Sequence, residues 1–186
     1  MELTPSQTVG PFYGLGLIDA RWAPAIEAAT PGERIRIEGR VLDGDGAPVI
    51  DGMLESWQAD AGGIYRHPRT TAGQALANDG FTGFRRISTT AEGRFGWETI
   101  MPGAVAQPDG SRHAPHINLG VFARGLLNRL STRLYFDGDP ANAEDPVLKL
   151  VEPARRGTLM AKKDEKGTWR LPIHLGGANE TVFFDC

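Results

Sequence analysis

Two polar side chains lie two positions apart in the segment HAPHINLGVFARG, residues 113–125, at a spacing that suits a metal ion. A His-x-His pair on a β-strand places both imidazoles on one face of the sheet, where they can share an ion. In this chain the first position is His116, but the second is Asn118. The segment therefore has the geometry of a metal site and only half of its donors.

No other stretch supplies a complete catalytic or metal-binding motif. The histidines show none of the His-x-His, His-x-x-x-His or cysteine-containing spacings that zinc sites use. The sequence also lacks a Gly-x-Ser-x-Gly elbow, a Walker loop and a Gly-x-Gly-x-x-Gly turn. The only cysteine, Cys186, is the last residue and a poor candidate for a nucleophile. On motifs alone, the chain is a β-protein without a metal.

Composition excludes several classes of protein. The 186 residues carry a net charge of -3, which argues against nucleic acid as the main partner. No apolar run approaches the roughly 20 residues of a membrane span, so we expect no membrane association. The N-terminal MELTPSQTVG has neither a basic start nor an apolar core, so we expect no signal peptide. One cysteine fits a reducing compartment, and we expect a cytoplasmic protein.

Short alternating segments are interrupted by turns, and the 24 glycines and 13 prolines are spread along the whole chain. This pattern predicts an all-β fold. We expect one domain, a β-sandwich of about seven or more strands with long loops. An irregular N-terminal arm would cover residues 1–33 and the sandwich residues 34–186. Short helical pieces are expected at 24–29 and 145–153, and both Trp57 and Trp97 are expected in the core. The predicted strands are 34–43, 53–60, 93–100, 116–123, 129–136, 168–175 and 181–185.

Four segments together resemble the intradiol ring-cleaving dioxygenases. They are TPSQTVGPFY, GRVLDGDGAPVIDGMLESWQADAGGIYRH, APHINLGVFARGLLNRLSTRLYF and ETVFFD, and the resemblance runs from Thr4 to Asp185. Within that family the combination is similar to the α chains of hetero-oligomeric members. The resemblance implies a subunit of an enzyme in aromatic catabolism, on the β-ketoadipate pathway.

Members of this family hold Fe(III) with two tyrosines and two histidines, and phenolate oxygens suit this hard ion. The matching positions here, which we call the relic set, are Tyr65, Val105, His116 and Asn118. Two donors of four are too few to hold iron tightly. The resemblance therefore implies that this chain binds no metal and has no catalytic residue, and that a partner β chain holds the Fe(III). Tyr65 and His116 are then expected to hydrogen-bond each other or nearby backbone.

The resemblance gives the N-terminal arm and one arginine a role in the partner's pocket. It implies that Thr8, Gly10, Pro11 and Phe12 cover the pocket and that Arg124 reaches into it. The implied substrates are O2 and 3,4-dihydroxybenzoate, a small aromatic acid whose carboxylate suits a guanidinium.

Two other functions are open on the sequence. The chain could be a homomeric iron-binding dioxygenase that uses Tyr65 and His116 with further ligands, such as His67 or His113. It could instead be a sandwich binding module without enzymatic activity, because a fold does not fix a function.

Overall fold

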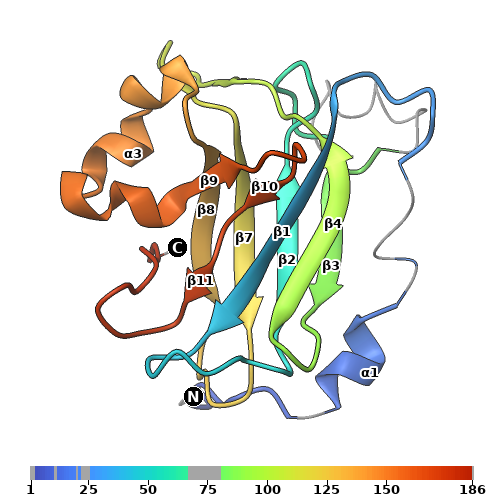
Figure 1. Ribbon diagram of the computed structural model, residues 1–186, viewed down its shortest axis with the longest axis vertical. Helices are drawn as coiled ribbons and strands as arrows, with labels where there is room; N and C mark the ends of the chain where they lie inside the picture. The colour runs from blue at the N-terminus through green and yellow to red at the C-terminus, as the bar shows by residue number, and fades with distance from the viewer. Residues whose placement is uncertain (1–2, 11, 20, 22–25, 67–80, 186) are drawn as a thin grey trace.

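The computed structural model describes residues 3–10, 12–19, 21, 26–66 and 81–185 (Figure 1). The helical elements are short: α1 (Tyr13–Leu17), η2 (Pro140–Ala143), α3 (Pro146–Leu150) and η3 (Pro153–Leu159). None of the helices in these ranges is long and apolar enough to cross a membrane. The strands are β1 (Arg34–Leu42), β2 (Met53–Gln58), β3 (Phe84–Ser88), β4 (Arg94–Ile100), β5 (Val105–Ala106), β6 (Arg112–His113), β7 (His116–Phe122), β8 (Leu130–Phe136), β9 (Met160–Lys163), β10 (Trp169–Arg170) and β11 (Ile173–His174).

The strands form two facing layers joined through β9. One layer contains β3, β2, β7 and β8, all antiparallel neighbours, and the other is built on β1 with β4, β10 and β11. β9 pairs with β8 through its first half and with β10 through its second half, so one strand passes from layer to layer. α3 and the two 3-10 helices lie together on one side of the sheets (Figure 1). The expected all-β sandwich is confirmed.

Alternation along the strands explains the core between the layers. In β1 the apolar positions two apart point inward, and in β7 the inward set is Ile117, Leu119 and Val121. Burying a side chain of this size contributes about 1.5–3 kcal/mol, so these rows fix which face of each strand is inside. Trp97 lies in this core, 4% exposed, as expected.

Trp57 corrects the expectation that both tryptophans are core residues. It is only partly buried, because the inward positions of β2 are Leu54, Ser56 and Gln58, and Trp57 points to the outer face. There it stacks on Tyr65, with ring centroids 5.7 Å apart. A tryptophan next to inward-facing neighbours in sequence must face outward, because successive side chains alternate.

Several boundaries also differ from expectation. The predicted strand 168–175 is divided into β10 and β11 around Pro172, which has no N–H to donate to a ladder. Within 181–185 the structure has only an isolated bridge between Ser131 and Phe184. β3, β5, β6 and β9 were not predicted, since each is short or lacks alternation.

The helical predictions were partly correct. α3 confirms the piece expected at 145–153; Asp145 caps it by accepting a hydrogen bond from the Leu148 N–H, and Pro146 begins it. Residues 26–29 of the other predicted piece are not helical, and residues 24 and 25 lie outside the described ranges. The arm, expected to be irregular, contains the five-residue α1.

Close contact between β1 and the segment before β11 predicts a stability effect at Gly39. A methyl group there would lie 2.0 Å from the Leu171 carbonyl oxygen and 2.4 Å from the Phe95 ring. We expect Gly39→Ala to lower the free energy of unfolding by about 2 kcal/mol or more, measured by urea denaturation. The matched control is Gly157→Ala, where a methyl group meets no atom within 4 Å. Equal stability of the two variants would contradict the contact.

Candidate functional site

Three members of the relic set meet on the outer face of β7. His116 and Asn118 lie two positions apart on this strand, and Tyr65 lies on the loop that follows β2. The Tyr65 hydroxyl is 3.1 Å from His116 Nε2, and it accepts a hydrogen bond of 2.8 Å from Asn118 Nδ2. The expected hydrogen bond between Tyr65 and His116 is confirmed. The two surviving donors therefore satisfy each other, and the asparagine satisfies the phenol.

His116 is held as a neutral base. It is 2% exposed, and its Nδ1 lies 2.7 Å from the Ala114 carbonyl oxygen, which fixes Nδ1 as the protonated nitrogen. Burial, together with the nearby Arg133 guanidinium, lowers the pKa of His116 to about 4. Nε2 is then the acceptor, and the Tyr65 hydroxyl donates to it. Burial raises the pKa of Tyr65, so the phenol keeps its proton.

Val105, the fourth member, is a buried hydrocarbon with no donor for a metal. It lies in β5 and pairs with His113 of β6, whose ring centroid is 5.7 Å from that of His116. The turn before it packs tightly on the loop before Tyr65: a methyl group at Gly103 would lie 2.5 Å from the Ala61 carbonyl oxygen. This backbone contact holds β5 beside the other members of the set.

Arg133 is the residue of this site that the sequence did not reveal. The register of β7 and β8 places it directly opposite Asn118. Its Nη1 lies 3.4 Å from His113 Nδ1 and 3.3 Å from the Tyr135 hydroxyl. Tyr135 in turn donates to Asp145, the N-cap of α3, at 3.1 Å. A guanidinium therefore supplies a fixed positive charge beside the relic set.

The relic set does not fit a ferric ion. Two of its positions have no anionic or imidazole donor, and the other two are hydrogen-bonded to each other. In the described ranges, no group of three or more His, Cys, Asp or Glu side chains could hold a metal ion. Of the additional ligands considered on the sequence, His113 faces Arg133, and His67 lies outside the described residues.

Two of the expected pocket-closing residues, Thr8 and Arg124, lie at the other end of β7. Thr8 of the arm accepts a hydrogen bond of 2.8 Å from the Gly125 N–H, next to Arg124. Arg124 forms an ion pair with Asp51, and the Tyr13 hydroxyl donates to the Asp51 carbonyl oxygen. Arm and arginine, 116 positions apart in sequence, are therefore brought together by the fold.

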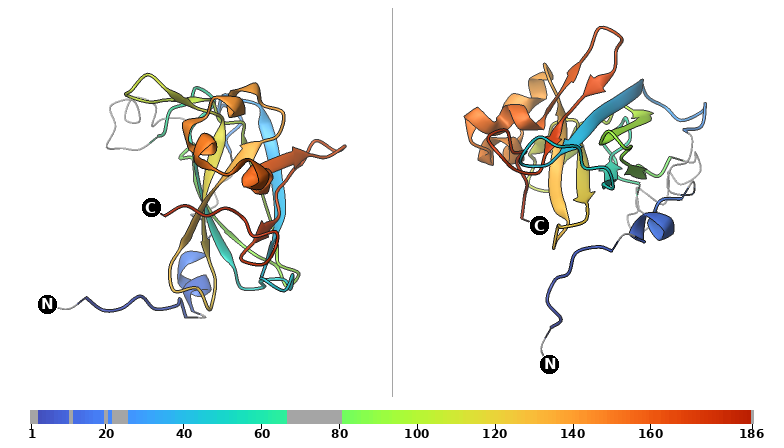
Figure 2. Two further views of the ribbon diagram at one scale, coloured as in Figure 1. Left: turned by 90° about the vertical axis from the view of Figure 1, so that its left-hand side faces the viewer. Right: turned by 60° about the horizontal axis from the view of Figure 1, so that its bottom comes forward.

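The rest of the arm offers an exposed surface. Gly10 is exposed and meets nothing where a side chain would begin, Phe12 is 76% exposed and Leu15 of α1 is 82% exposed, while Pro11 lies outside the described residues. The part of the arm that precedes α1 extends away from the sheets toward the N-terminus (Figure 2). At about 3.3 Å per residue, the length of β7 separates Arg124 from the relic set by roughly 20 Å. Arg124 therefore lies beyond the opposite end of β7, too far away to contact a ligand bound at the relic set.

A cavity of about 640 Å³ opens on the outer face of β2, β7 and β8, beside the relic set. We call it the outer cavity. Aromatic and cationic side chains form part of its walls, and Asn118 connects it to Tyr65 and His116. Its lining includes Trp57, Phe84, Asn118, Arg129, Arg133 and Phe184.

Comparison with known proteins agrees with the resemblance. A dioxygenase family model matches residues 10–171. The chain is 42% identical to a protocatechuate 3,4-dioxygenase alpha chain of Burkholderia cepacia, over 100% of this chain and 98% of that one. It is 38% identical to a beta chain from the same organism, over 82% of this chain and 67% of that one.

Among solved structures, the chain is similar to the dioxygenase domain of a carbohydrate-binding fusion protein from Streptomyces sp. SirexAA-E. The TM-score is 0.61 at 27% identity, with 95% of this chain and 100% of that chain covered. A 3-chlorocatechol 1,2-dioxygenase of Rhodococcus opacus 1CP shares the fold, with a TM-score of 0.64 at 23% identity. That match covers 84% of this chain and 63% of that one.

The depressed pKa of His116 predicts a pH dependence of stability. Between about pH 6.5 and pH 4 the unfolded chain protonates this histidine and the folded chain does not, so stability falls as the pH falls. We expect a loss of about 3 kcal/mol across this window, removed in His116→Gln. Urea denaturation at several pH values, with His174→Gln as the control histidine, measures it. An identical pH profile in His116→Gln and the parent chain would contradict the assignment.

Proposed function

The chain belongs to the intradiol dioxygenase family, and on this basis we propose that it is the non-catalytic α subunit of a hetero-oligomeric, Fe(III)-dependent protocatechuate 3,4-dioxygenase. Such an enzyme cleaves 3,4-dihydroxybenzoate with O2 to 3-carboxy-cis,cis-muconate. The β chain holds the iron, which supplies activation of the bound catechol toward O2. This chain contributes walls and charge to the β chain's pocket.

The observation that carries this proposal is the opposite placement of the two groups of residues. Three of the four family ligand positions, Tyr65, His116 and Asn118, are closed by hydrogen bonds to one another, and the fourth, Val105, has no donor. The residues suited to an aromatic acid, the arm and Arg124, lie at the far end of β7. A chain that served its own metal would need them together, whereas a chain that serves a partner does not.

The exposed arm supports a docking role. Phe12 and Leu15 present large apolar surfaces with little cover from this chain, and such surfaces are stabilised when a partner excludes water from them. Thr8 anchors the start of this segment on the loop of Arg124. An anchored arm loses less conformational entropy on binding than a free one, so it can close a partner's pocket at lower cost.

Arg124 is placed to recognise the carboxylate of the substrate. Its side chain is 57% exposed and pairs with Asp51, which holds it beside the arm. A guanidinium can donate two parallel hydrogen bonds to a carboxylate, which gives both orientation and affinity. In the assembled enzyme we propose that Arg124 turns to the substrate bound on the β chain, with Thr8, Gly10, Pro11 and Phe12 covering the ring.

Co-expression of the chain with and without its β partner tests the proposal. We expect the chain alone to be colourless, with less than about 0.1 iron per chain, and inactive in oxygen uptake with protocatechuate. The pair should show the tyrosinate-to-iron colour and activity. Stoichiometric iron on the chain alone would support the homomeric alternative. Full activity of an iron-loaded β chain without this chain would contradict the α-subunit assignment.

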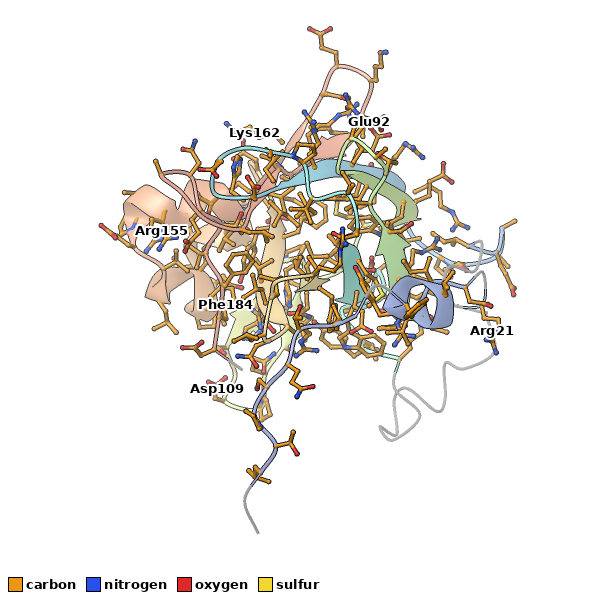
Figure 3. The ribbon with its side chains drawn as sticks, turned by 90° about the horizontal axis from the view of Figure 1, so that it is seen from below. Arg21, Glu92, Asp109, Arg155, Lys162 and Phe184 are labelled. Carbon is orange, nitrogen blue, oxygen red and sulfur yellow. The ribbon has the colours of Figure 1, made fainter. Side chains whose placement is uncertain are left out.

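Within the active pair, Arg124→Ala tests the carboxylate contact. We expect KM for protocatechuate to rise by about 10- to 100-fold, because a hydrogen bond to a charged group contributes roughly 1.5–3 kcal/mol. The control is Arg155→Ala, on the outside of the helical segments (Figure 3), where the arginine pairs with Glu180. The KM for catechol, which lacks the carboxylate, should change little in Arg124→Ala. An equal rise for both substrates would show a structural effect only.

A further inference from the structure

The outer cavity is built by rows of side chains that cross the sheet from strand to strand. One row runs from Phe84 of β3 through Trp57 of β2 to Asn118 of β7 and Arg133 of β8, each residue opposite the next in the strand registers. The centre of the neighbouring row is Gly120, which lies opposite both Glu55 and Ser131. A glycine in the middle of the sheet leaves room above the backbone, and the row of larger residues makes the wall.

Two guanidiniums give this cavity a positive charge. Arg129 lies over Gly120, since a methyl group there would be 2.9 Å from Arg129 Cδ. Across the described part of the chain, no carboxylate forms an ion pair with Arg129 or Arg133, and the acidic wall residue Glu55 is paired with Arg86 at 2.9 Å. The guanidinium Nη1 of Arg133 contacts His113 Nδ1 and the Tyr135 hydroxyl. The cavity therefore carries two guanidiniums: that of Arg133 is linked to the Asp145 carboxylate through the Tyr135 hydroxyl, whereas Arg129 is exposed.

The opposite wall is aromatic. Trp57 and Phe84 line it with ring centroids 6.4 Å apart, and Tyr65 backs Trp57 at 5.7 Å. Aromatic walls favour a flat ring by stacking and by edge contacts, while the arginines favour an anion. A volume of about 640 Å³ lies within the range of roughly 300–1,000 Å³ of small-molecule sites.

We propose that the outer cavity is a binding site for a small aromatic carboxylate, separate from the substrate pocket of the partner chain. The ring lies against Trp57 and Phe84, and the carboxylate is bound by Arg129 and Arg133. The ligand is bound and not converted, because the relic set cannot hold iron. The site belongs to this chain alone, so it does not depend on the α-subunit assignment.

The charges also distinguish this site from a ferric site that has merely lost two ligands. Arg133 faces Asn118 across β7 and β8, so a cation bound at the relic set would lie beside a fixed guanidinium. The guanidinium would repel a cation at this neighbouring position. The same guanidinium favours an anion in the adjoining outer cavity. Arg133 therefore disfavours a cation at the relic set and favours a carboxylate in the outer cavity.

Titration of the full, iron-free chain with benzoate tests the proposal, by calorimetry and by tryptophan fluorescence. We expect one benzoate per chain, and at least about tenfold weaker binding of benzamide, the neutral isostere. Arg133→Gln and Arg129→Gln should each weaken benzoate by a similar factor. The control is Arg40→Gln, which should leave benzoate binding unchanged. The Arg40 side chain donates to the carbonyl oxygen of Glu92, which lies apart from Phe184 of the outer cavity (Figure 3).

Arg129 is exposed, so its variant keeps the test decisive if Arg133→Gln fails to fold. In the co-expressed pair, benzoate should bind at two sites per pair, and Arg129→Gln should reduce this to one while activity with protocatechuate persists. Comparing 3,4-dihydroxybenzoate with benzoate on the chain alone separates the enzyme's own substrate from aromatic acids in general as the ligand. No benzoate binding, or equal binding by the parent chain and Arg129→Gln, would overturn the proposal.

Discussion

Strand β7 has a different environment on each face of its pleat. Ile117, Leu119 and Val121 pack into the core, and one step away His116, Asn118 and Gly120 face outward. A shift of one position in pairing would place the polar set in the core and the aliphatic set in solvent, which the hydrophobic effect forbids. The register with β2 and β8 is therefore fixed by burial. That register in turn decides that Trp57 and Arg133 stand on either side of Asn118, and so creates both the relic set and the outer cavity.

On this face the positive charge is supplied by a side chain, the guanidinium of Arg133, and not by a bound ion. Arg133 lies near His113, His116 and Tyr135, and its charge together with burial keeps the pKa of His116 low. The imidazole is neutral and accepts from Tyr65, and the phenol is neutral and accepts from Asn118. The Tyr65 hydroxyl, both His116 nitrogens and Asn118 Nδ2 are satisfied without an ion. Satisfied buried networks are rigid, so the face is stabilised as it is.

The opposite end of β7 has the reverse character. There the arm, Arg124 and Asp51 form contacts near solvent, and Phe12 remains exposed. Such a surface is stabilised by association, whereas the relic set needs no partner. The family match and the two related chain types, alpha and beta, fit a division of work in which one strand supports a closed site at one end and a docking surface at the other.

The sequence by itself determined the fold class, because alternation in β1, β7 and β8 shows directly which residues are buried. Through the family resemblance it also indicated a weakened metal site, because valine at position 105 has no donor and asparagine at position 118 has neither a phenolate nor an imidazole. It did not place Trp57 on the outer face, Arg133 opposite Asn118 or Thr8 beside Gly125. Those pairings join segments far apart along the chain, and no local pattern encodes the register between them. Only the tertiary structure decided them, because burial of the whole core selects one register.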